Sequence, residues 1–157
     1  MTCALMAGRS QASEESLKVR AADEVKGSTR KISSEILDLI DLKGKVTEAG
    51  PYDTPCSGHS GGNVYRAVHP WSVYDVPVDD MRKSMDRLRR DLPRHGWKIV
   101  KDGPDGSPSK APQIVANHEG GEFSVDMRLH DERKYGNKPS LIEVTIESAC
   151  FKTKKPD

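Results

Sequence analysis

The sequence predicts an α+β domain: an antiparallel sheet of about five strands with two helices packed on one face, as a two-layer sandwich. Three observations carry this prediction: an amphipathic helix near the middle of the chain, strict apolar–polar alternation in the late strands, and short turns between those strands. Strands joined by short turns are antiparallel neighbours. A sheet with one apolar face needs helices to cover that face.

The clearest element is the segment 78–97. Five apolar residues recur at spacings of three and four and form one helical stripe: Val78, Met81, Met85, Leu88 and Leu92. Pro93 should end the last regular turn near Leu92, and Gly96 is the expected left-handed stop. Arginines and aspartates alternate on the other face, which favours a solvated surface over a phosphate-binding one.

A second, weaker helix precedes the first strand. Its start signal is the segment 13–16, and Gly27 should interrupt or weaken it. The apolar stripe, with Thr29 filling its gap, is formed by Val25, Ile32, Ile36 and Leu39. We expect Gly44 to close this helix.

The remaining apolar segments are predicted to form strands. Pro70 should break or bulge the second of them, which indicates an edge or a bent strand. Residues 123–129 alternate between apolar and polar side chains and form the cleanest amphipathic strand. The expected strands are 45–52, 63–74, 97–100, 113–117, 123–129 and 142–150, with a hairpin turn at 119–122.

Length and composition set the domain organisation. The chain has 157 residues, 34% hydrophobic and 31% charged, which suits a single domain with one modest core. We expect that domain at 15–152, with disordered tails at 1–14 and 153–157. A net charge of +1 argues against a polyanion-binding protein, and no apolar run reaches the length of a membrane span.

Three cysteines leave several readings open. A Cys56–Cys150 disulfide would close a loop of 94 residues (150 − 56) and requires the first and last strands to lie close together. Alternation along the last strand places Cys150 on the helix-covered side. The alternatives are two unpaired thiols, or a zinc site using Cys56 and His59, which lacks a second pair of ligands.

Five segments together resemble small actinobacterial (Streptomyces-type) cell-envelope lipoproteins of unknown function: TPCSG at 54–58, HPWSVYDVP at 69–77, RLRRDLPRHGWKIV at 87–100, SPSKAPQIVA at 107–116 and ESACF at 147–151. The similarity covers about residues 30–152. It implies a secreted α+β domain with a Cys56–Cys150 disulfide and a lipid anchor on Cys3.

The N-terminus departs from the lipoprotein pattern. Only Met1 and Thr2 precede Cys3, and Thr2 is not the Gly or Ala that usually precedes a lipidated cysteine. Either the chain is a trimmed or mis-started form, or Cys3 is an ordinary tail cysteine. We expect an extracytoplasmic, membrane-anchored or secreted protein, and a cytoplasmic one if Met1 is the true start.

No motif specifies an enzymatic activity, so we expect a non-enzymatic domain that binds a protein or a small ligand at the cell envelope. The expected surface joins the glycine-rich loop 57–63 to the bend at residues 69–71. Its candidate binding residues are Trp71, Tyr65, Tyr74, His69 and His59.

Two other functions remain open. A small metal-dependent hydrolase would use His59, His118 or His130 with nearby carboxylates. A cytosolic nucleic-acid or partner-binding module would use the Arg-rich helix face. We expect no cofactor, no nucleic-acid partner and a monomer.

Overall fold

The computed structural model describes residues 17–59 and 62–154. The expected N-terminal tail 1–14, including Cys3, lies outside the described residues, as do the helix start signal at 13–16 and residues 155–157. At the other end, the Thr153 N–H donates to the carbonyl of Asn63 at 2.8 Å, so the folded region extends at least to Thr153.

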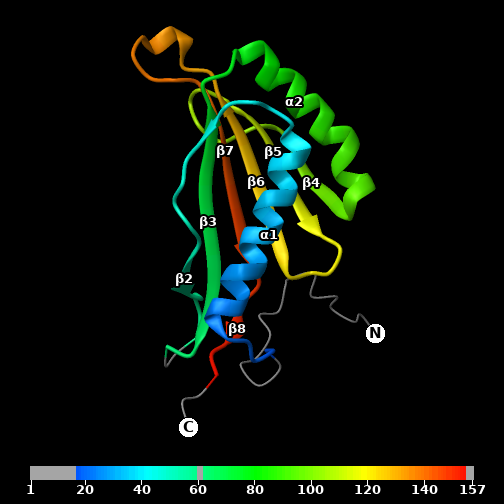
Figure 1. Cartoon of the computed structure of the whole chain (residues 1–157), viewed down its shortest axis with the longest axis vertical. Helices are drawn as coiled ribbons and strands as arrows, with labels where there is room; N and C mark the ends of the chain where they lie inside the picture. The colour runs from blue at the N-terminus through cyan, green and yellow to red at the C-terminus, as the bar shows by residue number, and fades with distance from the viewer. Residues whose placement is uncertain (1–16, 60–61, 155–157) are drawn as a thin grey trace, which may run out of the picture.

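The structure confirms an α+β fold in which a large antiparallel sheet is covered by two helices (Figure 1). The helices are α1 (Ala22–Ile40) and α2 (Val78–Asp91), with short 3-10 turns η2 (Leu92–His95) and η3 (Arg133–Tyr135). The strands are β1 (Lys45–Val46), β2 (Tyr52–Pro55), β3 (Val64–Tyr74), β4 (Trp97–Pro104), β5 (Pro112–His118), β6 (Phe123–His130), β7 (Leu141–Ser148) and β8 (Phe151–Lys152).

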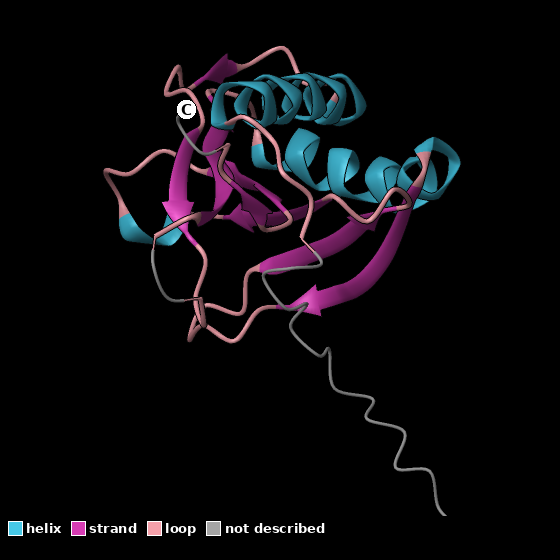
Figure 2. Cartoon of the chain, turned by 90° about the horizontal axis from the view of Figure 1, so that it is seen from below, coloured by secondary structure: helices cyan, strands magenta, loops and turns pink. Residues whose placement is uncertain are grey.

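In the part of the chain that the structure describes, the sheet has eight strands rather than about five. Its order is β1-β3-β7-β6-β5-β4, with β2 and β8 also paired to β3, and each of these pairings is antiparallel. Viewed from below, both helices lie side by side over one face of the sheet (Figure 2). The expected two-layer arrangement is therefore present with a wider sheet.

Helix α2 follows its sequence pattern closely. All five residues of the expected stripe are buried, and the regular helix ends at Asp91, where η2 takes over with Pro93 in its first turn. Gly96 then stops the helix with φ of 85°. The chain returns directly into β4, whose first residue, Trp97, is buried.

Helix α1 differs from the prediction at both ends. It begins at Ala22 and runs without a break through Gly27, whose position is open to solvent. Asp41, with φ of 51°, is the left-handed residue that ends the helix, rather than Gly44. A β-carbon on Gly44 would collide with the carbonyl oxygen of Tyr74, so this glycine allows close approach of the chain to β3.

The main core lies between the helices and the strands that they cover. It joins the α2 stripe and Ile32, Ile36 and Ile40 of α1 to the helix-facing residues of β3, β5, β6 and β7. Ile40 takes the buried position expected of Leu39, which is only partly buried. Thr29 is fully buried, and its hydroxyl donates to the Val25 carbonyl at 2.7 Å, which satisfies the polar atom inside the stripe.

The expected strand 45–52 is split into two. β1 and β2 both pair with β3, and between them residues 47–51 leave the sheet edge; we call these five residues the strap. We expected Pro70 to break or bulge its own strand, and this prediction is wrong. β3 runs unbroken through Pro70, which pairs with Thr145 of β7, and the irregularity falls in the neighbouring edge instead.

The expected disulfide is present: Cys56 and Cys150 are bonded. The first and last strands are not direct neighbours, because β3 lies between them and Tyr65 pairs with Pro55 on one side and with Phe151 on the other. The bond therefore joins two segments that flank the start of β3. In the chain-entropy model, a loop of 94 residues stabilises the fold by roughly 4–5 kcal/mol.

The expected orientation of Cys150 is wrong. Val68 pairs with Glu147, but Tyr65 pairs with Phe151, so one extra residue has entered the strand opposite β3. Such a bulge reverses the alternation of side chains. Phe151, rather than Cys150, consequently packs with Val25 of α1 in a second core cluster.

The late strands match their patterns, with one extension. β4 continues to Pro104 past a register shift after Ile99, where a loop was expected from residue 101. Asp105 then accepts hydrogen bonds from the N–H of Ser107 and of Ala111, both at 3.0 Å, and holds the loop before β5.

None of the described helices is both long and apolar enough to span a bilayer.

Candidate ligand-binding site

An open pocket of about 260 Å³ lies between α1, β3 and the strap. About two turns of α1 form the first wall with Arg30, Ser33, Ser34 and Leu37. His69 and Trp71 of β3 form the floor, and the segment 46–50 forms the opposite wall. We call this hollow the strap pocket.

The pocket exists because the strap cannot pair fully with β3. Thr47 is still held to the strand: its N–H donates to the Ser72 carbonyl, and the Ser72 N–H donates to the Thr47 hydroxyl. N–H groups alternate along a strand, so residue 70 should donate in the same direction as Ser72, but proline has no N–H. The strap also carries one residue more than the opposite stretch 69–72, so it bows away from the sheet.

His69 replaces the missing backbone pairing with a side-chain contact. Its Nε2 lies 2.7 Å from the Ala49 carbonyl oxygen, and its Nδ1 lies 2.7 Å from the Ser33 hydroxyl oxygen. A carbonyl can only accept, so the neutral ring carries its proton on Nε2, and Nδ1 accepts from Ser33. One imidazole thus joins the strap to α1.

Trp71 completes the floor. Its indole N–H donates to the Ser33 hydroxyl oxygen at 3.1 Å, and its side chain is almost fully buried. Ser33 therefore donates one hydrogen bond and accepts another, and is only 6% exposed. Each polar group of the floor is therefore satisfied: the indole N–H, the Ser33 hydroxyl and the imidazole N–H all donate to protein atoms.

A hydroxyl that donates to an imidazole is also the first contact of a nucleophile–base pair. Here the second ring nitrogen meets a backbone carbonyl rather than a carboxylate, and the Ser33 oxygen is occupied by the indole N–H. This arrangement favours a positioning role for Ser33 over a nucleophilic one.

The mouth of the pocket carries two charges of opposite sign, on Arg30 and Glu48. The Arg30 guanidinium lies against the strap: its Nη2 atom is 3.1 Å from the position that a β-carbon on residue 50 would occupy. Gly50 therefore makes room for the guanidinium. A side chain at position 50 would push Arg30 away from the strap.

The structure brings together only two of the predicted binding residues, His69 and Trp71, whose ring centroids are 6.4 Å apart. Tyr74 lies at the far end of β3, about 30 Å from Tyr65 at the usual rise of a strand. His59 follows β2 in the glycine-rich loop, of which residues 60–61 lie outside the described residues. No described residue of the loop 57–63 lines the strap pocket.

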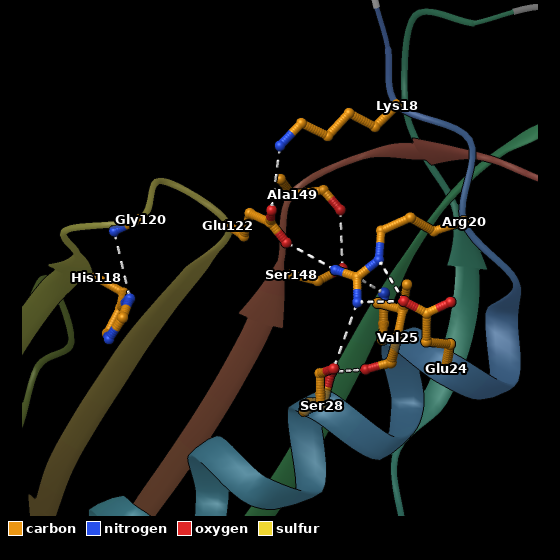
Figure 3. A network of polar contacts seen from close by, with 12 residues as sticks. Lys18, Arg20, Glu24, Val25, Ser28, His118, Gly120, Glu122, Ser148 and Ala149 are labelled. Carbon is orange, nitrogen blue, oxygen red and sulfur yellow. Dashed lines mark hydrogen bonds and ion pairs between the residues drawn. The ribbon is translucent and has the colours of Figure 1, made fainter.

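Tyr65 contacts a separate polar network at the start of α1, whose members Arg20, Glu24 and Glu122 are seen in Figure 3. Its hydroxyl donates to the Arg20 carbonyl at 2.7 Å, and burial raises the pKa of the Tyr65 hydroxyl. The Arg20 guanidinium pairs with Glu122 at 2.7 Å and with Glu24 at 2.9 Å, and lies over the Phe151 ring. Because its charged groups are paired with one another, this network has a structural role: it holds the segment before α1 to Glu122.

The other candidate residues have structural contacts. His118 packs edge-on against Trp97, with ring centroids 4.9 Å apart, and His130 Nε2 lies 3.7 Å from a Glu143 carboxylate oxygen. His95 donates to the Asp91 carbonyl at 2.8 Å, as expected of a residue at a helix end. Across residues 17–59 and 62–154, no group of three or more His, Cys, Asp or Glu side chains could hold a metal ion.

Much of the Arg-rich face of α2 is committed to the fold. Arg87 donates to the Ile40 and Asp41 carbonyls at the C-terminus of α1, where carbonyls lack a partner within the helix. Arg89 makes ion pairs with Asp86 and Asp102. These contacts leave fewer charges for a phosphate backbone than the sequence alone indicates.

Sequence reasoning missed the α1 side of the pocket, namely Arg30, Ser33 and Leu37. One signal was present: Ser33 lies on the buried side of an otherwise apolar stripe, where a hydroxyl needs a partner. That partner is His69, 36 residues further along the chain, and no local pattern reveals it.

Comparisons with known proteins found no significant match: no protein-family model, no curated protein and no solved structure matches this chain. The interpretation of the strap pocket therefore rests on its own geometry. The resemblance to actinobacterial lipoproteins stays a prediction.

We predict that Ser33→Ala destabilises the protein by about 1–3 kcal/mol, because the Trp71 N–H and the His69 Nδ1 each lose their partner in a buried place. The measurement is urea-induced unfolding followed by tryptophan emission. Ser34→Ala is the matched control. It removes an exposed hydroxyl from the next position of α1, so its effect should stay within about 0.5 kcal/mol. Equal stability of both variants would show that the floor network contributes nothing.

Proposed function

We propose that this protein is a non-enzymatic binding domain of the cell envelope and that it holds a small ligand in the strap pocket. The observation that carries the proposal is the pocket itself. Apolar side chains and satisfied polar groups form its floor, two charged groups lie at its mouth, and one wall is a segment that has left the sheet. Ligand sites typically combine an apolar lining with a few polar groups that orient the ligand.

The pocket is also held in shape before a ligand arrives. Hydrogen bonds from Ser33, His69 and Trp71 fix the floor, and Thr47 fixes the upstream end of the strap. A preformed site loses little conformational entropy on binding. This supports binding as the role of the pocket.

The envelope location is supported by the disulfide. Bonds of this kind persist in oxidising compartments and are rare in a reducing cytosol. The bond between Cys56 and Cys150 joins segments that flank β3, so it is part of the fold and not a peripheral link. A lipid on Cys3 and a monomeric state belong to the same proposal.

We expect the neutral eight-carbon probe 1-octanol to bind saturably to the wild-type protein and not to Ser34→Trp. Ser34 is an exposed residue of the pocket wall, so an indole there occupies the mouth without entering the core. Isothermal titration calorimetry measures the binding. Glu35→Trp, one position along on α1 and outside the lining, should bind like the wild type. Unchanged binding in Ser34→Trp, or no saturable binding by the wild type, contradicts the proposed site.

The compartment has its own test. Cells that make the protein are treated with a membrane-permeant alkylating reagent before lysis, and the mass of the intact protein is measured. An envelope protein should carry no alkyl group on Cys56 or Cys150, because both sulfurs are in the disulfide. Alkylation of both cysteines in most molecules would place the protein in a reducing compartment.

A further inference from the structure

The strap pocket has an inner end and an outer end of different chemistry, and the difference restricts what it can bind. At the inner end, the indole N–H, the serine hydroxyl and the imidazole N–H are already donated to protein atoms. A polar ligand group placed there would lose its water and gain no donor in return. Leu37, Val46 and the Trp71 ring instead offer apolar contact.

At the outer end, Arg30 has an unused charge. Six of the other nine arginines in residues 17–59 and 62–154 lie within 4 Å of a carboxylate oxygen: Arg20, Arg66, Arg82, Arg89, Arg128 and Arg133. Arg87 donates to backbone carbonyls, and Arg90 and Arg94, which have no ion pair with a described residue, do not line the pocket. The Arg30 side chain has no hydrogen bond or ion pair with any described residue, although it is placed against Gly50 at the pocket mouth. A guanidinium presents a planar fork of donors that suits a carboxylate or a phosphate.

We propose that the ligand of the strap pocket is a small organic anion with an apolar body, whose charged head pairs with Arg30 and whose body lies on the floor beside Leu37 and Trp71. This inference rests on the proposed function of the pocket. At about 30 Å³ for each water-sized group, 260 Å³ has room for a body of about eight or nine non-hydrogen atoms.

Glu48 is the group that opposes this assignment. It lines the same pocket from the exposed strap, and it makes no ion pair with Arg30. Its carboxylate would repel an anionic head and attract a cationic one. The position of Arg30, packed against the strap backbone at Gly50, favours the guanidinium as the group that meets the ligand.

The test compares three probes with the same eight-carbon chain: octanoate, 1-octanol and octylamine. We expect the wild-type protein to bind octanoate about tenfold more tightly than 1-octanol, and octylamine more weakly still, by titration calorimetry. Arg30→Gln should remove the preference, so that octanoate binds no more tightly than 1-octanol to this variant. Lys31→Gln, a charge of the same sign on the next residue of α1 and outside the lining, should keep the preference.

Glu48→Gln tests whether the Glu48 carboxylate repels an anionic ligand. The anion assignment expects octanoate to bind at least as tightly in this variant, because a repulsive charge is gone. Weaker octanoate binding there, or a preference for octylamine in the wild type, overturns the assignment.

The proposed function and this inference fail in different ways. If the three probes bind equally well and Ser34→Trp abolishes all of them, the pocket binds ligands and the anion assignment is wrong. If no probe binds in a manner that Ser34→Trp abolishes, both are wrong.

Discussion

The structure depends most on the pairing of one strand, β3. This strand of 11 residues pairs with β1 and β2 on one side and with β7 and β8 on the other. Its helix-facing residues supply both core clusters: Trp71 and Val73 to the main one, and Tyr65 and Ala67 to the smaller one. A change in the pairing of β3 therefore affects the sheet, both core clusters and the edge formed by β1 and β2.

The single residue of β3 without an N–H, Pro70, determines where the edge opens. Because the strap is tied at Thr47 and resumes pairing at Tyr52, it can bow outward only between these points. The opening would expose the Trp71 indole. Ser33 accepts the hydrogen bond from its N–H and donates to His69, and His69 in turn holds the strap at the Ala49 carbonyl. The pocket is thus a consequence of a missing backbone donor, with side chains in place of the backbone bonds.

The two ends of β3 are secured by different means. At its start, the disulfide and the Arg20 network hold the neighbouring segments together, the first by a covalent bond and the second by paired charges. At its other end, Tyr74 pairs with β1 and β7, and Gly44 allows the chain leaving α1 to pass closely over it. Fixed ends and an open middle suit a strand that carries a binding site.

Local patterns predicted the parts of the fold that depend on local physics. The α2 stripe, its end at Pro93 and Gly96, and the alternation along β6 were all correct, because periodicity and backbone stereochemistry determine them within a few residues. The pairing of Cys56 with Cys150, which the resemblance to the lipoproteins implied, was also correct. The sheet class followed from these elements, but the number of strands did not.

Most of the errors share one cause: they depend on pairing or packing with a segment far away in the sequence. The effect of Pro70 falls on the strap, some 20 residues earlier in the chain, and one extra residue before Phe151 turns Cys150 away from its expected side. Gly27 does not interrupt α1, because tertiary packing of the stripe outweighs a local helix cost of about 1 kcal/mol. His69 and Trp71 were identified as site residues, whereas Ser33 and Arg30 could be found only once α1 was placed over β3.

The central claim is that this protein binds its ligand in the strap pocket, between α1, β3 and the strap. The most direct measurement is a titration of octanoate into the ¹⁵N-labelled protein, with amide chemical shifts recorded at each step. The account predicts that the largest shifts fall together on residues 30–37, 46–50 and 69–71. Largest shifts on the charged loop 131–135 or on the helix-free face of the sheet, with the strap unchanged, would contradict it.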